Sequence, residues 1–258
     1  MASAETALIT GASSGIGLEL ARLFAADRSA LLLVARRADR LEVLAKELRK
    51  THGITVHVLP LDLTAPRAPE EILAWTRDHG IALDVLVNNA GFGARGRFAD
   101  LDRQGQLDML QVNVAALTHL THLFLPGMLE RRRGAILNVG SQAGFQPGPR
   151  MAVYYATKAY VLSFSEALAE ELRGSGVRVT VLAPGATATE FAAKADMLGS
   201  RVFRTGVMDA RSVALAGYRG LRRGEVLVVP GLKGKLSASA VRFLPRALVR
   251  RVVHTLQS

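Results

Sequence analysis

The segment from Ala4 to Asp27 constrains the fold of this chain more than any other. A short apolar strand, Ala4 to Ile9, runs directly into TGASSGIG, Thr10 to Gly17, and then into the helical pattern IGLELARLFAAD. Strand, glycine turn and helix form the arrangement in which backbone amides at a helix N-terminus receive a pyrophosphate. The spacing G-x-x-x-G-x-G permits a tight turn and close approach of a phosphate. An ordinary glycine-rich turn is the alternative, and the flanking strand and helix favour the nucleotide site.

The rest of the chain alternates strands with helical segments. Further strands are predicted at Ala30 to Ala35, Thr55 to Leu61, Leu83 to Val87, Ala135 to Val139, Val177 to Leu182 and Val226 to Val229. This alternation predicts an α/β fold with a parallel sheet, whose ligands bind beyond the carboxyl ends of the strands. The 258 residues suit one large domain, and no linker divides them. We predict a dinucleotide-binding catalytic domain over residues 1–230 and a basic amphipathic extension over 231–258.

Two arginines follow the second predicted strand. A cofactor with a free ribose 2′-hydroxyl usually meets an acidic residue at this strand end, whereas a 2′-phosphate is accommodated by arginine. Arg36 occupies that position, so the sequence favours NADPH over NADH. Surface charge is the alternative interpretation of Arg36 and Arg37. The nearby Asp39 precedes RLEVLAKELRK and is expected to be the N-cap of that helix.

Ser141, Tyr154 and Lys158 carry the candidate chemistry. Tyr154 and Lys158 are four residues apart in a segment with helical apolar spacing, so both side chains should lie on one helical face. Because a neighbouring cation favours a phenolate, we expect Lys158 to lower the pKa of Tyr154. Ser141, at the end of the strand GAILNVGS, is expected to hold the substrate oxygen by hydrogen bonding. Y-x-x-x-K occurs by chance on many helices, so the assignment depends on the other motifs.

A long helical segment, Gln104 to Arg131, lies between these regions. Its pattern predicts a break at Pro126-Gly127, and Asn113 lies inside it. An asparagine in an apolar helix is more often a satisfied polar residue than a catalytic one. His119 and His122 are assigned to the helix surface or an interface. Since the chain has no cysteine and no third ligand is in view, no metal site is predicted.

Composition bears on location and partners. No charged leader precedes an apolar stretch at the N-terminus, and no run of about 18 uninterrupted apolar residues occurs, so we expect a cytoplasmic protein. The 33 basic and 22 acidic residues give a net charge of +11. Such a charge suits anionic cofactors, acidic carrier proteins or lipid surfaces, with a solvated basic face as the simplest interpretation. Nucleic acid is disfavoured, because few aromatic residues are interleaved with the basic tail.

Two regions near the C-terminus are expected to act on substrate or partners. Residues 187–223 form the least regular part of the chain and are predicted to overhang the rim as a substrate lid. This region carries Phe191, Met197, Leu198, Phe203, Val207 and Met208, which favour an apolar pocket. The tail from Val226 to Ser258 carries six Lys or Arg residues and no Asp or Glu. Its apolar and basic residues, interrupted by Pro245, favour subunit packing, with a membrane surface or an acidic partner as alternatives.

In their order along the chain, these features resemble the short-chain dehydrogenase/reductase family. The resemblance covers roughly residues 4 to 230 and rests on TGASSGIG, Asp62, NNAG at Asn88 to Gly91, Asn113, Ser141, Tyr154 with Lys158, and Pro184-Gly185. Particularly specific is the placement of Ser141 thirteen residues before Tyr154. The resemblance implies a single-domain, Rossmann-type, doubly wound sheet of seven parallel strands with helices on both faces, which binds a nicotinamide dinucleotide.

Family roles are implied for the matching positions. Tyr154 would be the acid/base, Lys158 would also hold the nicotinamide ribose, and Ser141 would orient the substrate carbonyl. Asn113 would hold a water that continues a proton relay from Lys158 to solvent. The implied cofactor contacts are Gly11, Gly15 and Gly17 at the pyrophosphate, Asp62 at the adenine, Asn89 at the adenosine ribose, Thr189 near the carboxamide and Arg36 at the 2′-phosphate, together with Thr10, Ser13, Ser14, Ile16, Leu63, Pro184, Gly185 and Thr187. Ser14 stands where NADP-preferring members often carry a basic residue.

The sequence therefore predicts an NADP(H)-dependent oxidoreductase that interconverts a ketone and a secondary alcohol, with a small hydrophobic or acyl-chain molecule as substrate. The resemblance implies a homodimer or homotetramer assembled through the helices at Gln104 to Arg131 and Tyr154 to Arg173. A 3-oxoacyl carrier-protein reductase is the first alternative, and the basic surface would suit its acidic carrier. A non-catalytic dinucleotide-binding regulator is the second, which the presence of all three candidate catalytic residues disfavours.

Overall fold

Seven parallel strands form the central sheet of the computed structural model, which describes residues 5–197, 206–241 and 243–257. The strands are β1 (Thr6–Thr10), β2 (Ala30–Ala35), β3 (Val56–Pro60), β4 (Val85–Asn88), β5 (Gly134–Val139), β6 (Val177–Leu182) and β9 (Leu227–Val228). They lie in the order β3-β2-β1-β4-β5-β6-β9, and every pairing is parallel. The predicted seven-stranded sheet is thus confirmed. Ala4, where the first strand was predicted to begin, lies outside the described residues.

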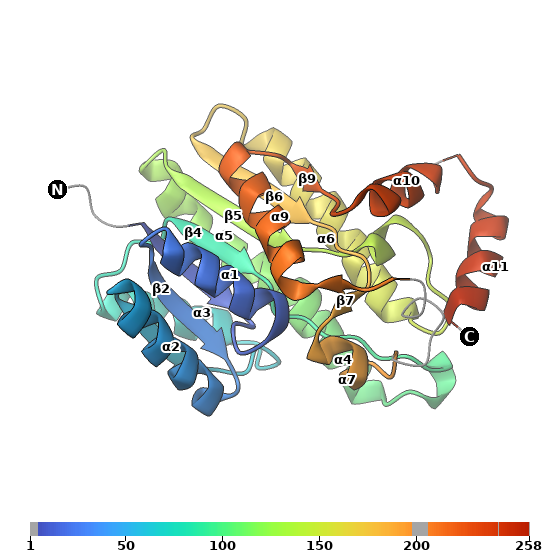
Figure 1. The fold of residues 1–258 in the computed structure, drawn as a ribbon, viewed down its shortest axis with the longest axis horizontal. Helices are drawn as coiled ribbons and strands as arrows, with labels where there is room; N and C mark the ends of the chain where they lie inside the picture. The colour runs from blue at the N-terminus through green and yellow to red at the C-terminus, as the bar shows by residue number, and fades with distance from the viewer. Residues whose placement is uncertain (1–4, 198–205, 242, 258) are drawn as a thin grey trace.

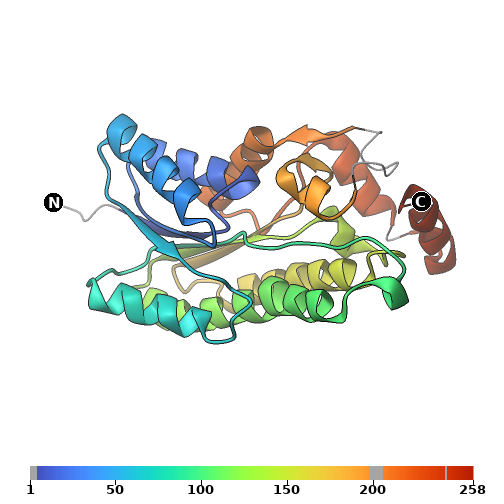
Figure 2. The same cartoon turned by 90° about the horizontal axis from the view of Figure 1, so that it is seen from below.

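Helices cover both faces of this sheet (Figure 2). One layer contains α1 (Gly15–Ala26), α2 (Ala38–His52) and α9 (Ala210–Arg223), and the other contains α3 (Ala68–Asp78), α5 (Leu117–Glu130) and α6 (Ala152–Glu171). Successive strand residues point to opposite layers, so Ala7 and Ile9 pack with α1 while Leu8 packs with α5. Burial on both faces explains why the strands read as continuous apolar runs rather than alternating ones.

The strand order reverses beside β1, and this reversal determines where a ligand can bind. β1 pairs with β2 on one side and with β4 on the other, so the chain crosses over β1 between the third and fourth strands (Figure 1). Loops that leave the carboxyl ends of neighbouring strands in opposite directions open a crevice between them. The glycine loop, Arg36, Asp62, the NNAG motif, Ser141 and Pro184-Gly185 all lie at or just after strand ends and therefore meet along this rim.

The long helical segment continues past its predicted break. Its successive elements are α4 (Arg103–Leu110), the π-helical turn η2 (Gln111–Ala116) and α5 (Leu117–Glu130). Pro126 lies inside α5, because burial of Phe124 and Met128 on the sheet outweighs the hydrogen bond that proline cannot donate. The run from Arg103 to Glu130 is long and apolar enough to cross a membrane by length and composition alone. In this fold its apolar face is packed on the sheet.

Two local predictions differ from the structure. Helix α2 begins at Ala38 with Arg37 as its N-cap residue, so Asp39 lies in the first turn rather than at the cap. A carboxylate there still favours the helix, because it faces the positive end of the helix dipole. The predicted lid, 187–223, is also more regular than expected. It contains β7 (Thr187–Ala188), α7 (Glu190–Lys194), β8 (Met208–Asp209) and the core helix α9. Leu198 and Phe203 lie outside the described residues.

The C-terminal tail folds back on its own chain. Helices α10 (Leu232–Ala240) and α11 (Arg246–Gln257) lie beyond the carboxyl ends of the strands (Figure 1). Val249 and Val253 of α11 are buried in a cluster with Met151 and Tyr155. The inner face of the tail covers the rim of its own subunit. Packing of the tail on a second subunit stays a prediction. Short 3-10 turns at Phe98–Asp100 (η1) and Gln142–Phe145 (η3) complete the described elements.

Candidate active site

The glycine loop lies against the loop that follows β4. Gly11 and Gly15 have φ values of +67° and +56°, in the left-handed region that favours glycine. A Cβ atom at Gly11 would lie 2.7 Å from Nδ2 of Asn89, and one at Gly17 would lie 2.4 Å from the same atom. Ser14 is the N-cap residue of α1, and its side chain makes no capping hydrogen bond to the first turn. The first amides of α1 are therefore available to an anion, as a pyrophosphate site requires.

Thr10 and Asn89 hold this loop in place. Oγ1 of Thr10 donates to the carbonyl of Val87 at 3.2 Å and accepts from the amides of Asn89 and Ala90, both at 3.0 Å. Nδ2 of Asn89 donates to the carbonyls of Thr10 and Gly11 at 2.8 and 3.2 Å. The Asn89 amide group thus positions the loop, and its contact with the adenosine ribose stays a prediction.

Arg36 extends from the end of β2 at the outer end of the site. Its guanidinium is 65% exposed and lies 3.7 Å from a carboxylate oxygen of Asp62. The other carboxylate oxygen of Asp62 accepts a hydrogen bond from the amide of Thr64 at 3.0 Å, which fixes the side chain. Both residues line the same cavity, in the positions expected for an arginine and an acidic residue beside the adenosine half of a dinucleotide.

Arg37 is more than a surface charge. Its Nη2 donates to the hydroxyls of Ser13 and Ser14, both at 2.9 Å, and its Nη1 donates to Glu190 at 2.7 Å. Arg40 contacts the second oxygen of the same carboxylate. Hydrogen bonds from Arg40 and Arg37 lower the pKa of Glu190 to about 2. These contacts could not be predicted from the sequence, because α7 and α2 are far apart in the chain.

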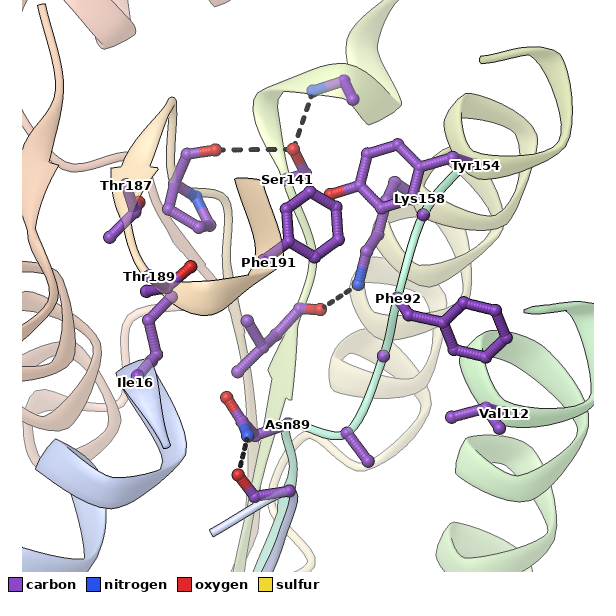
Figure 3. A pocket seen from close by; sticks show the side chains of 18 of the residues that line it. Ile16, Asn89, Phe92, Val112, Ser141, Tyr154, Lys158, Thr187, Thr189 and Phe191 are labelled. Atoms are coloured by element: carbon purple, nitrogen blue, oxygen red, sulfur yellow. Dashed lines mark hydrogen bonds between the residues drawn. The ribbon is translucent and has the colours of Figure 1, made fainter. Parts of the chain in front are cut away.

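Ser141, Tyr154 and Lys158 meet at the end of β5 (Figure 3). Oγ of Ser141 accepts from the amide of Ala143 at 3.1 Å and donates to the carbonyl of Pro184 at 3.5 Å. Tyr154 and Lys158 lie one turn apart on α6 with exposures of 8% and 6%. The structure brings together the three residues that the sequence selected, with the hydroxyl of Tyr154 directed toward Ser141.

The predicted effect of Lys158 on Tyr154 is wrong in this structure. Burial raises the pKa of Tyr154 to about 12, and a hydrogen bond with Ser141 offsets only part of that rise. Nζ of Lys158 lies 5.8 Å from the centre of the tyrosine ring and donates to the carbonyl of Val139 at 2.8 Å. Burial also lowers the pKa of Lys158 to about 8. Tyr154 is therefore a neutral phenol at neutral pH, which is the form that donates a proton.

Asn113 lies in the π-helical turn η2, a distortion that often marks functional positions. Its Oδ1 accepts from the amide of Phe92 at 3.1 Å, and its Nδ2 donates to the carbonyl of Phe92 and to Oγ1 of Thr157. The side chain thus ties the loop after β4 to helix α6. These contacts support a positioning role, and the predicted water relay stays a prediction.

One cavity of about 600 Å³ joins these parts of the rim. Of the residues predicted from the sequence, Gly11, Ser13, Ser14, Gly15, Ile16, Arg36, Asp62, Leu63, Asn89, Ser141, Tyr154, Lys158, Pro184, Gly185, Thr187 and Thr189 line it. Thr10, Gly17 and Asn113 support its wall from behind. The glycine loop, the basic outer end and the buried phenol fit an elongated dinucleotide whose reactive end reaches Tyr154.

Phe191 was predicted in the substrate lid, and its ring centre lies 5.2 Å from that of Tyr154. Two other residues at the substrate end were not predicted from the sequence. Tyr155 and Gln257 also line the cavity, and neither was singled out. The paired tyrosines of YYATK were a weak signal for Tyr155. Gln257 had none, because its place depends on how the tail folds back.

Comparisons with known proteins agree with this geometry. The model of the short chain dehydrogenase family matches residues 5–197. A sulfoacetaldehyde reductase of Chromohalobacter salexigens is 40% identical over 214 residues, covering 82% of this chain and 79% of the relative. A short-chain dehydrogenase of Sphingobium yanoikuyae, solved in complex with NADPH, superposes with a TM-score of 0.84 at 36% identity and 95% coverage of both chains. A bulky-bulky ketone specific alcohol dehydrogenase of Comamonas testosteroni gives a TM-score of 0.80 at 33% identity, with coverages of 95% and 93%.

Proposed function

The chain belongs to the short-chain dehydrogenase family and is an oxidoreductase, and from this premise we propose that it reduces a ketone to a secondary alcohol with NADPH. The observation that carries this proposal is the buried, neutral Tyr154 beside Ser141, in a cavity that continues to the glycine loop. The similarity to an NADPH complex and to a ketone-specific dehydrogenase supports the cofactor and the reaction class.

The residues at the outer end support a phosphorylated cofactor. The first amides of α1 would receive the pyrophosphate, and Arg36 would bind the 2′-phosphate from its exposed position beside Asp62. Arg37 would add to this binding, because its guanidinium already lies over the hydroxyls of Ser13 and Ser14. Two arginines and no acidic residue directly after β2 favour NADPH over NADH.

At the inner end, Ser141 and Tyr154 would hold the substrate carbonyl by its oxygen. Bound NADPH would supply the hydride that reduces the carbonyl carbon. Tyr154 then gives its phenolic proton to the oxygen, and the Lys158 ammonium favours the phenolate that remains. Proton donation by a positioned group contributes roughly 100-fold to 10,000-fold to such a reaction. Burial raises the pKa of Tyr154, and alcohol oxidation requires the phenolate at the start, so oxidation should need a higher pH than ketone reduction.

The substrate end of the cavity supports an apolar substrate. Phe191, Met197, Val253 and Leu256 line it together with the catalytic tyrosine. A hydrophobic ketone is the first candidate. A 3-oxoacyl group on an acidic carrier protein is the second, because Arg246, Arg250 and Arg251 are exposed on α11 beside the cavity.

A screen of NADPH consumption tests the proposed function. Purified protein is mixed with NADPH, and in parallel with NADH, against a panel of aliphatic, aromatic and steroid ketones and free and carrier-bound 3-oxoacyl thioesters. We expect consumption of NADPH, several-fold faster than that of NADH, with at least one ketone. Activity confined to carrier-bound thioesters would identify the protein as a 3-oxoacyl carrier-protein reductase. Faster consumption of NADH across the panel would contradict the cofactor assignment.

Location and assembly are part of the same proposal. We infer a cytoplasmic protein, where NADPH is available to it. Leu107, Leu110 and Tyr160 are partly exposed on α4 and α6, and they support assembly into a homodimer or homotetramer through these helices. Sedimentation of the purified chain gives the number of subunits.

A further inference from the structure

Helix α11 forms a wall at the substrate end of the cavity. Its residues Val253, Leu256 and Gln257 line the cavity. Val249 and Val253 anchor the helix in the buried cluster that contains Tyr154 and Tyr155. The tail is therefore part of the surface that a substrate would touch.

Gln257 is fixed at this wall from two directions. Its backbone carbonyl accepts from Nε and Nη2 of Arg95 at 2.8 and 2.6 Å. Its side chain is fully buried, and Nε2 donates to the hydroxyl of Tyr155 at 2.7 Å. Oε1 of Gln257 has no hydrogen-bond partner among the described residues. A buried amide oxygen without a partner is uncommon and calls for a ligand or a water.

The hydroxyl of Tyr155 is the hydrogen-bond partner of the Gln257 side chain. It accepts the hydrogen bond from Gln257 and retains its own proton, for which the described residues show no acceptor. Burial raises the pKa of Tyr155, so the phenol stays neutral at neutral pH. Among the described residues, the pair thus holds one unpaired donor, the Tyr155 hydroxyl, and one unpaired acceptor, Oε1 of Gln257, and both residues line the cavity.

This conclusion holds in both orientations of the Gln257 amide, whose oxygen and nitrogen are assigned from hydrogen bonding. If the amide is turned over, Oε1 accepts the proton of Tyr155. The Gln257 amino group is then the open donor, and the Tyr155 oxygen is the open acceptor. A hydroxyl group both donates and accepts one hydrogen bond, so it satisfies the pair in either case.

We propose that Tyr155 and Gln257 form a subsite for a hydroxyl group of the substrate, so that the preferred substrates are hydroxyketones with an otherwise apolar skeleton. This inference rests on the proposed ketone reduction and adds a second point of attachment. The ring centres of Tyr154 and Tyr155 are 6.1 Å apart, so the hydroxyl binds close to the reacting carbonyl without sharing its partners. Two attachment points fix the face of the carbonyl that receives the hydride.

The test compares ketones that differ only in one hydroxyl group. Values of kcat/KM are measured with NADPH for heptan-2-one and its 5-, 6- and 7-hydroxy derivatives. We expect one hydroxyketone to exceed heptan-2-one on the order of 100-fold, because the parent ketone leaves buried polar groups unpaired. Gln257→Leu and Tyr155→Phe keep the approximate size of each side chain and should each abolish most of this preference. Thr255→Val is the matched control, because Thr255 lies on the exposed side of α11.

The outcomes separate this inference from the proposed function. Loss of the hydroxyl preference in both variants, with NADPH affinity and thermal stability near wild-type values, supports the subsite. Equal kcat/KM for heptan-2-one and all three derivatives in the wild-type enzyme overturns the subsite and leaves ketone reduction standing. A preference that survives in Gln257→Leu and Tyr155→Phe also overturns it. The absence of NADPH consumption with every ketone contradicts the proposed function itself.

Discussion

The glycine loop at the cofactor end and helix α11 at the substrate end differ in how their polar groups are paired. Around the loop, Thr10 and Asn89 satisfy one another and the neighbouring carbonyls. On α11, Gln257 is buried, and one of its amide atoms has no hydrogen-bond partner among the described residues. The glycine loop is thus held in shape by its own hydrogen bonds, whereas Gln257 at the substrate end retains an unpaired buried oxygen, which the proposed subsite would use. Changes at the glycine loop should therefore affect NADPH binding, and changes at α11 should affect the use of the ketone.

Removal of α11 should have the larger effect, confined to substrate use. A chain that ends at Leu244 loses the wall formed by Val253, Leu256 and Gln257, so a ketone is no longer positioned. We expect kcat/KM for the ketone to fall about 100-fold while NADPH affinity stays within a factor of about two, because misplacement of a reactant is costly. Steady-state kinetics and fluorescence titration with NADPH measure the two quantities.

Val252→Ala, on the exposed side of α11, is the control and should change neither quantity. An equal loss of NADPH affinity in the shortened chain would show that the two ends are not independent. The native mass of the shortened chain gives its number of subunits, and an unchanged number would exclude α11 from the subunit interface.

Gly17→Ala should weaken NADPH binding at the glycine loop. The added Cβ atom would lie 2.4 Å from Nδ2 of Asn89 and 2.5 Å from the carbonyl oxygen of Gly11, so the loop must open. Such overpacking costs about 1 to 3 kcal/mol, and NADPH affinity should fall roughly 5- to 100-fold if the bound loop bears that cost. Isothermal titration with NADPH measures the loss.

Gly80→Ala is the matched control for Gly17→Ala. Gly80 has no neighbour within 4 Å of an added Cβ, but its φ is +63°, so alanine there strains only the backbone. Thermal stability should fall by about 1 to 2 kcal/mol with NADPH affinity unchanged. If both variants bound NADPH as tightly as the wild type, the loop geometry would not set cofactor affinity.

Arg36→Asp should shift cofactor selectivity by a smaller factor. The Arg36 side chain is 65% exposed, so solvent screens its charge, and we expect the preference for NADPH over NADH to fall on the order of 10-fold. Arg37→Gln should shift selectivity less, because Glu190 already pairs with Arg37. Ratios of kcat/KM for the two cofactors measure both effects. If cofactor selectivity changed in the Arg37 variant and not in the Arg36 variant, Arg37 would be the residue that binds the 2′-phosphate.

The smallest predicted effect is a pH dependence that differs between the two directions of reaction. The pKa of Lys158 is about 8, so its ammonium is lost above that pH and ketone reduction should fall several-fold. The pKa of Tyr154 is about 12, so alcohol oxidation, which needs the phenolate, should rise as the pH increases toward that value. Rate profiles in both directions check this, and a flat oxidation profile would contradict the raised pKa of Tyr154.

The difference between the cofactor end and the substrate end also explains which residues could be predicted from the sequence. Cofactor-site residues follow strand ends in short continuous motifs, so the alternation of strands and helices was enough to place Gly11, Asp62 and Ser141 on one rim. The pKa of Tyr154 was predicted in the wrong direction, because four-residue spacing shows that Lys158 is near but not how deeply both are buried. Gln257 was not predictable at all, since only the folding of the tail brings it to Tyr155, about a hundred residues away in the chain.

The central claim, that Tyr154 donates the proton during NADPH-dependent ketone reduction, is tested most directly by Tyr154→Phe. The measurement is NADPH consumption by wild-type and variant protein with the best ketone of the panel, alongside NADPH binding by fluorescence. The account predicts a loss of turnover of roughly 100-fold to 10,000-fold with NADPH binding largely intact. Turnover by the variant at the wild-type rate would contradict the account.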